Sequence, residues 1–97
     1  MEDINFSAKS VDLNMGGIFC TLDQDVPIWS KMEISLNLPI EGNPCSVYLE
    51  GIVVRCEPKD AVLFDAAIAF INTDPKVEYL LSQYLLQSMP HDQHLMH

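Results

Sequence analysis

The chain has 97 residues, a hydrophobic share of 48% and a formal net charge of −9, because 14 acidic residues outnumber 5 basic ones. This length and hydrophobic content suit one small domain with a packed core. So acidic a chain repels the phosphate backbone of nucleic acids and lacks the basic clusters that bind anionic membranes. Neither nucleic acid nor a membrane is therefore expected as a partner.

The segments that direct export or bind metals are not evident in the sequence. The first residues lack the basic and apolar stretches of an export signal, and no apolar run approaches the roughly 18 residues that cross a bilayer, so we expect a cytoplasmic protein. Three cysteines without a Cys-x-x-Cys pair predict neither a disulfide framework nor a zinc knuckle. Histidine occurs only at His91, His94 and His97, which leaves no catalytic Ser-His-Asp or Cys-His arrangement, so neither an enzyme nor a metal site is expected.

Hydrophobic periodicity predicts a mainly β domain with short turns. The clearest signal runs from Met32 to Leu38, where apolar and polar residues alternate as in a strand with one buried face. Gly51, inside a long apolar segment, predicts a bulge or bend at which the sheet can curve and close. The predicted strands are residues 4–11, 18–22, 32–38, 46–56 and 64–71.

A helix is predicted after the last strand. Asp74 is a typical N-cap and Pro75 suits the first helical position, where its missing N–H costs nothing. Apolar residues then recur from Val77 at i, i+3, i+4, i+7 and i+8, and Pro90 marks the end of the helix. We expect the apolar stripe to dock on the sheet, where small alanines of the last strand leave room for it.

Together these elements predict a small antiparallel β-barrel of about six strands with one C-terminal α-helix packed across it. An open sheet with one helix is the alternative. The domain is expected to span residues 1–90, and residues 91–97 are expected to form a loose tail.

The segment from residue 12 to residue 17 reads Asp-Leu-Asn-Met-Gly-Gly and opens directly into an apolar strand. Asp12 and Asn14 can bond the backbone of a tight turn, while Gly16 and Gly17 can adopt positive φ or allow another group close to the main chain. Such a loop serves either as a plain connection or as a ligand-facing turn. The pattern alone favours the plain turn.

This segment resembles the Asp/Asn-x-Ser-x-x-Gly motif of the PilZ domain family, the bacterial receptor fold for the second messenger cyclic di-GMP. Asp12 and Gly17 fall in register with the motif, and Asn14 stands where serine is usual. Residues 50–55, Glu-Gly-Ile-Val-Val-Arg, resemble the family's Gly-x-Val-Val-Arg strand, and residues 67–70 resemble the strand before its C-terminal helix. The resemblance extends over nearly the whole chain.

The chain departs from the family at the flexible N-terminal arm, which in the family carries Arg-x-x-x-Arg. Arg55 is the only arginine and belongs to a predicted central strand, where an ion-paired surface role is favoured, and Lys9 cannot replace two guanidinium groups. The resemblance implies that those arginines contact phosphates and guanine faces. Losing two charge-assisted contacts of about 1.5–3 kcal/mol each weakens binding roughly a hundredfold to ten-thousandfold. Cyclic di-GMP is therefore disfavoured as a ligand, and no other cofactor is expected.

The favoured function is a degenerate PilZ-like adaptor that acts by protein contact. The apolar residues Met15, Ile28 and Trp29 are the candidate partner-binding residues, with Trp29 either a binding anchor or a cap over the barrel mouth. The resemblance implies a partner from a motility, pilus or second-messenger signalling system. A monomer or homodimer is expected.

The alternative is a cyclic di-GMP receptor with altered contacts. In that case Asp12, Asn14 and Gly17 would be the ligand-binding residues and would hold one guanine. The side-chain amide of Asn14 would then replace the family's serine hydroxyl. We favour the simpler reading, in which Asn14 stabilises its own turn.

Overall fold

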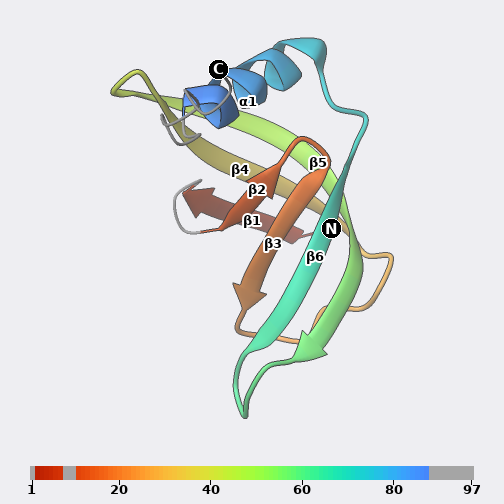
Figure 1. The fold of residues 1–97 in the computed structure, drawn as a ribbon. Coiled ribbons are helices and arrows are strands. Elements are labelled where there is room, and N and C mark those ends of the chain that lie inside the picture. Colours follow the sequence, from red (N-terminus) through yellow and green to blue (C-terminus); the bar gives the residue numbers. More distant parts are fainter. Residues whose placement is uncertain (1, 8–10, 88–97) are drawn as a thin grey trace, which may run out of the picture.

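A computed structural model of the chain describes residues 2–7 and 11–87. Six strands form one curled sheet, a half-barrel, and a single helix follows them (Figure 1). The elements are β1 (Glu2–Ser7), β2 (Asp12–Asn14), β3 (Gly17–Leu22), β4 (Lys31–Ile40), β5 (Asn43–Pro58), β6 (Phe64–Ile71) and α1 (Pro75–Gln87). The predicted mainly β fold with one C-terminal helix is confirmed. The predicted helix end at Pro90 and the predicted tail lie outside the described residues.

The strand order across the sheet is β1-β4-β5-β6-β3-β2. The strands β4, β5 and β6 form an antiparallel meander, and β3 pairs antiparallel with both β6 and β2. In one detail the sheet differs from the expected antiparallel arrangement, because β1 pairs with β4 in parallel, with Ile4 opposite Ile34. The long connection between β1 and β4 makes a parallel pairing possible. The strands β1 and β2 form the two edges of the half-barrel.

The N-terminal boundaries also differ from the prediction. The first strand ends at Ser7 instead of continuing to residue 11, and residues 8–10 lie outside the described part of the chain. Residues 12–14, predicted as part of a turn, form the short strand β2. Its pairing with β3 leaves Met15 and Gly16 as a two-residue turn, so the motif segment is a β-hairpin.

The hairpin between β4 and β5 turns at Glu41 and Gly42, whose φ values are 51° and 82°. Two positive φ values at the central positions define the hairpin turn that matches the twist of the strands. Ile40 and Asn43 close this turn as a hydrogen-bonded pair, so the next pair, Pro39 and Pro44, needs no N–H group. Both strands therefore extend through prolines that lie outside the predicted strands, residues 32–38 and 46–56.

The bulge in β5 lies three residues beyond the predicted position. The register shifts between Val53 and Arg55, which leaves Val54 as the extra residue, while Gly51 is regularly paired. Gly51 is needed for packing, because a Cβ atom there would lie 2.5 Å from the Cγ2 atom of Ile68. The glycine lets β5 pass over the core, and the bulge reverses which face the following residues occupy.

The core lies inside the curl of the sheet, and alternate residues of β4 supply a large part of it, as predicted. Leu81 and Tyr84 of α1 are buried in the same core, and the side chain of Asp74 accepts a 2.8 Å hydrogen bond from the Lys76 amide as the predicted N-cap. The most deeply buried side chains are Ile18, Met32, Ile34, Leu36, Leu38, Val53, Ile68 and Leu81. Burying each of them contributes about 1.5–3 kcal/mol of transfer free energy.

The helix packs mainly on β4 and β5, as Figure 1 shows, and not on the alanines of β6 as the sequence suggested. Its last turn is attached to the β4–β5 hairpin. The side chain of Gln87 accepts a 2.8 Å hydrogen bond from the amide of Glu41 and donates one to the carbonyl of Pro39. Among the described residues, no helix has the length and apolar character needed to span a membrane.

Candidate functional site

The β2–β3 hairpin brings the three predicted ligand-binding residues, Asp12, Asn14 and Gly17, onto one short element. The side-chain oxygen of Asn14 accepts hydrogen bonds from the amides of Gly16 at 2.8 Å and Gly17 at 2.9 Å. Asn14 thus stabilises its own turn, as the favoured interpretation predicted.

The two glycines of the hairpin differ in what they do. Neither has a positive φ, so the turn does not depend on that freedom at either position. A Cβ atom at Gly17 would lie 2.2 Å from the carbonyl oxygen of Ile68, whereas one at Gly16 would meet nothing closer than 3.5 Å. Gly17 is therefore required because β3 and β6 approach closely there.

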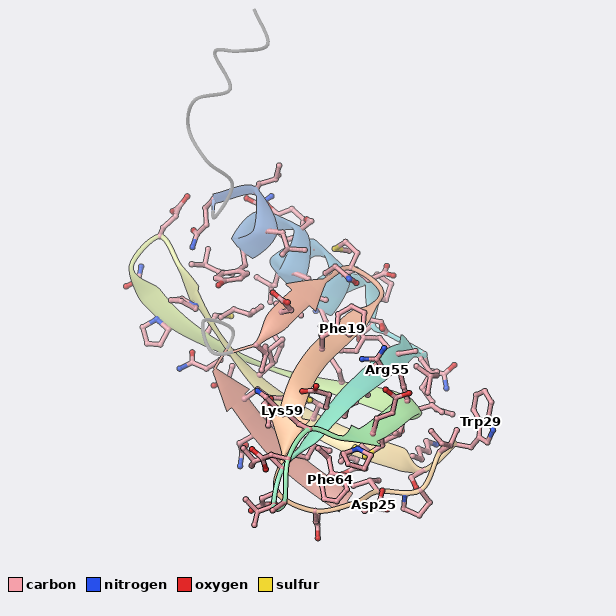
Figure 2. All side chains as sticks on the ribbon, turned by 60° about the horizontal axis from the view of Figure 1, so that its bottom comes forward. Phe19, Asp25, Trp29, Arg55, Lys59 and Phe64 are labelled. Atoms are coloured by element: carbon pink, nitrogen blue, oxygen red, sulfur yellow. The ribbon has the colours of Figure 1, made fainter. Side chains whose placement is uncertain are left out.

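Asp12 lies at one end of a row of side chains that crosses four strands. Asp12 is directly opposite Phe19, Phe19 is opposite Ala67, and Ala67 is opposite Arg55. Residues that face each other across strands share a face of the sheet, and here it is the outer face. Arg55 reaches this face because the bulge at Val54 shifts the register by one residue. Figure 2 shows Phe19 and Arg55 beside each other.

Phe19 is the site residue that sequence reasoning missed, whereas Arg55 has the ion-paired surface role that the sequence analysis favoured. Phe19 is 48% exposed although it is a large apolar side chain in a strand. Its position opposite Asp12 follows from the two-residue turn, so a hairpin prediction would have found it. The outward orientation of Arg55 depends on the bulge, for which the local pattern carries no signal.

The alanines of β6 border a hollow on this outer face instead of receiving the helix. Ala69 lies opposite Gly17, and Ala67 lies opposite Phe19, so small residues fill the middle of the face. The hollow has a volume of about 140 Å³ and is also lined by Asn14 and Val54. The predicted space beside the alanines therefore exists, but α1 does not pack into it.

A larger pocket of about 570 Å³ lies on the other side of Phe19 and is lined by Asp12, Arg55 and Asp65. Phe6 of the edge strand β1 also lines it, so the pocket opens between the two edges of the half-barrel. The edges of the curled sheet, which no strand pairing joins in the described residues, create this opening.

Carboxylates dominate the charge of this pocket and its rim. Glu57 lies directly opposite Asp65, which is an unfavourable pair of like charges. Arg55 is the guanidinium that faces them, and its Nε atom lies 3.9 Å from an oxygen of Glu57. Asp12 and Asp65 line the pocket with Arg55, so two carboxylates and one guanidinium group lie in its wall, with Glu57 beside them. The charged side chains of this site thus carry a net negative charge, which favours cations over anions.

The predicted partner-binding residues lie on two different loops. Met15 is in the β2–β3 turn, and Ile28 and Trp29 are in the loop between β3 and β4. All three are exposed, and Trp29 is 72% exposed, so its ring does not cover the core as the alternative interpretation required.

Trp29 has a φ of 75°, which is unfavourable for a bulky side chain. Hydrogen bonds on both sides hold this conformation. The amide of Trp29 donates to the carbonyl of Val53 at 2.7 Å, and the amide of Val53 donates to the carbonyl of Ser30 at 2.9 Å. Ser30 in turn bonds to the carbonyl of Pro27 through its hydroxyl at 2.6 Å. The ring is presented to solvent by a turn fixed to β5.

Cys20 and Cys56 lie on the inner face, on either side of Ala66. Burial, and to a lesser extent the proximity of Cys56, raises the pKa of the Cys20 thiol from 9.0 to about 11. A thiol with a raised pKa is protonated at neutral pH and a poor nucleophile. In the described residues, histidine, cysteine and carboxylate side chains form no cluster that could hold a metal ion.

An exposed hairpin, an aromatic ring and a charged pocket on a small curled sheet define a binding domain. A comparison with protein-family models matches the PilZ domain over residues 1–87. The chain therefore belongs to the PilZ domain family, whose members are cyclic di-GMP-binding signalling domains. No curated protein and no solved structure matches the chain significantly.

Proposed function

We propose that the chain is a non-enzymatic, cytoplasmic signalling adaptor that acts by protein contact, with cyclic di-GMP binding lost or strongly weakened. The observation that carries this proposal is the charge of the pocket beside Asp12. Two carboxylates, those of Asp12 and Asp65, line it together with one guanidinium group, that of Arg55, whose Nε atom lies 3.9 Å from an oxygen of Glu57. A nucleotide with two phosphates would be repelled there, and the net charge of −9 acts in the same direction.

The motif hairpin supports the same proposal. The oxygen of Asn14 is occupied by two backbone amides, and Gly17 is needed for the contact of β3 with β6. Both residues therefore have structural reasons to be present without a ligand. Arg55 is the only arginine in the sequence. The sequence therefore lacks the pair of guanidinium groups that contacts phosphates in the family. We place the partner among proteins of bacterial motility, pilus assembly or second-messenger signalling.

Isothermal titration of the full chain with cyclic di-GMP tests the proposal. We expect no measurable heat of binding at micromolar ligand concentrations. The double variant Asp65→Asn and Glu57→Gln removes the two facing carboxylates, and we expect it to gain affinity for the nucleotide if charge is the obstacle. Low-micromolar binding to the unmodified chain would refute the proposal.

A receptor with altered contacts is the second candidate, and one observation favours it. Asp12, Phe19 and Arg55 line the same pocket. A carboxylate can accept hydrogen bonds from a guanine edge, an aromatic ring can stack on the base, and a guanidinium can bind a phosphate. Amide NMR shifts in the hairpin and at Arg55 on adding nucleotide, lost in Phe19→Ala and kept in Val62→Ala, would favour this candidate. An unchanged spectrum at high ligand concentration would remove it.

A further inference from the structure

Trp29, one of the two most exposed large apolar side chains of the described residues, is held in an unfavourable backbone conformation. Left-handed backbone is unfavourable for a residue with a Cβ atom, and burial does not compensate this cost at Trp29 because its ring lies in solvent. Hydrogen bonds from Val53 and Ser30 fix the turn all the same. Strain at an exposed aromatic residue points to a use outside the monomer.

Trp29 is the end of an apolar surface that continues over β5 to β3. The amide of Trp29 bonds to the carbonyl of Val53. The next residue, Val54, is 41% exposed and lines the same hollow as Phe19. In Figure 2 Arg55 lies between Phe19 and Trp29. We call this surface the Trp29 patch. It consists of Phe19, Ile28, Trp29 and Val54, which are each between 41% and 72% exposed.

Acidic side chains lie beside the Phe19 end of the Trp29 patch. Asp12 is opposite Phe19, and Glu57 and Asp65 face each other on the same outer face. These three carboxylates outnumber the one cation beside them, Arg55. An apolar centre with an acidic border complements a segment that has apolar residues on one side and Lys or Arg on the other.

We propose that the Trp29 patch is the docking surface for a basic amphipathic segment of a partner protein, with Trp29 as the anchor. This inference rests on the proposed function, since it specifies the partner of an adaptor that acts by protein contact. Cations of the partner would relieve the repulsion between Glu57 and Asp65, and its apolar side chains would cover Phe19 and Val54. Tryptophan in such a position contributes a large share of binding energy.

A peptide titration of the full chain tests this. The probe is a synthetic amphipathic peptide of leucine and lysine, and its counterpart carries glutamate in place of lysine. Trp29 is the only tryptophan, so its emission reports directly on the patch. We expect the lysine peptide to shift the emission to shorter wavelength and the glutamate peptide to leave it unchanged.

Calorimetry with variants locates the binding surface. We expect Trp29→Gly and Phe19→Ala each to weaken binding of the lysine peptide by about tenfold or more. Val62→Ala and Tyr79→Ala, exposed apolar residues of another loop and of the helix, serve as controls with unchanged affinity. Circular dichroism confirms that each variant is folded.

Three outcomes would overturn the inference. The first is that the lysine peptide binds Trp29→Gly as tightly as the unmodified chain, and the second is that the glutamate peptide binds as tightly as the lysine peptide. The third is an emission shift caused by raising the protein concentration alone, which would assign the patch to a second copy. Nucleotide titration is a separate measurement, so low-micromolar binding of cyclic di-GMP would refute the adaptor function without affecting the peptide result.

Discussion

Gly17 lies against the carbonyl oxygen of Ile68, so closely that a Cβ atom at Gly17 would be 2.2 Å from that oxygen. No side chain fits between β3 and β6 at this point. The glycine that matches the PilZ motif is thus required by the sheet itself. Because Asn14 likewise holds its own turn, both motif residues have a structural role that does not require a nucleotide.

We expect Gly17→Ala to lower the free energy of unfolding by about 2–4 kcal/mol, because the backbones of β3 and β6 must separate to admit the methyl group. Gly16→Ala is the matched control. Its Cβ would lie 3.5 Å from the nearest atom and its φ is not positive, so we expect a change of less than about 1 kcal/mol. Urea unfolding of both variants provides the comparison, and equal effects would show that the close approach is not the cause.

Asn14→Ala removes two hydrogen bonds from an exposed turn and should lower the free energy of unfolding by about 1 kcal/mol. Asn14→Ser restores the residue usual in the family and keeps a shorter acceptor, so we expect a smaller loss. Neither variant should bind cyclic di-GMP in a calorimetric titration, since neither changes the charge of the pocket. Micromolar binding by Asn14→Ser would instead show that the residue at this position, and not the charge of the pocket, controls nucleotide binding.

The sequence predicted the faces of the strands better than their partners. Alternation between apolar and polar residues marked the buried side of β4 correctly, because burial acts on each residue locally. The same pattern cannot say which strand lies beside which, so the parallel pairing of β1 with β4 was missed. The helix was predicted from its cap and its apolar stripe, but its docking place depends on the completed sheet.

The candidate site depends on one residue that does not follow the alternation. Without the bulge at Val54, Arg55 would point into the core and would not share a face with Phe19 and Asp12. The bulge was predicted at Gly51 because glycine is frequent at bulges. In the structure, Gly51 is instead needed for packing against Ile68. The two-residue turn of the β2–β3 hairpin, in contrast, could have been predicted from the sequence.

Trp29→Gly should leave the free energy of unfolding unchanged or raise it by up to about 1 kcal/mol, because glycine adopts a φ of 75° without strain. Ile28→Gly in the same turn, where φ is not positive, should lower it by about 0.5–1 kcal/mol. Thermal and urea unfolding test the contrast. A marked loss of stability in Trp29→Gly would mean that the ring supports the fold and would weaken the case for a docking role.

Cys20 should react slowly with a maleimide in the folded protein. Its pKa is raised to about 11, so at pH 8 its thiolate fraction is about a hundredfold smaller than in the unfolded chain, where the pKa is 9.0. The unfolded chain in urea is the matched control, and mass spectrometry of peptides identifies the labelled cysteine. Reaction of Cys20 at equal rates in both states would contradict the raised pKa.

The same shift predicts how stability changes with pH. Since the folded state retains the Cys20 proton to higher pH than the unfolded chain, its contribution is constant below about pH 9 and is lost as the pH rises towards about 11. Urea unfolding of the native chain and of Cys20→Ser across this range isolates the contribution. A parallel decline in both proteins would assign the pH dependence to other groups.

The order of strands in the sheet also bears on how the protein folds and on which part of it opens locally. In the meander, each of the strands β4, β5 and β6 pairs with its neighbour in sequence. In contrast, Ile18 of β3 pairs with Ile68 of β6, 50 positions further along the chain. The meander is therefore the natural folding nucleus, and the motif hairpin attaches to it late. We expect the amide protons of β2 and β3 to exchange with deuterium sooner than those of β5, so that the hairpin bearing Asp12 and Phe19 is the part of the sheet that opens most readily.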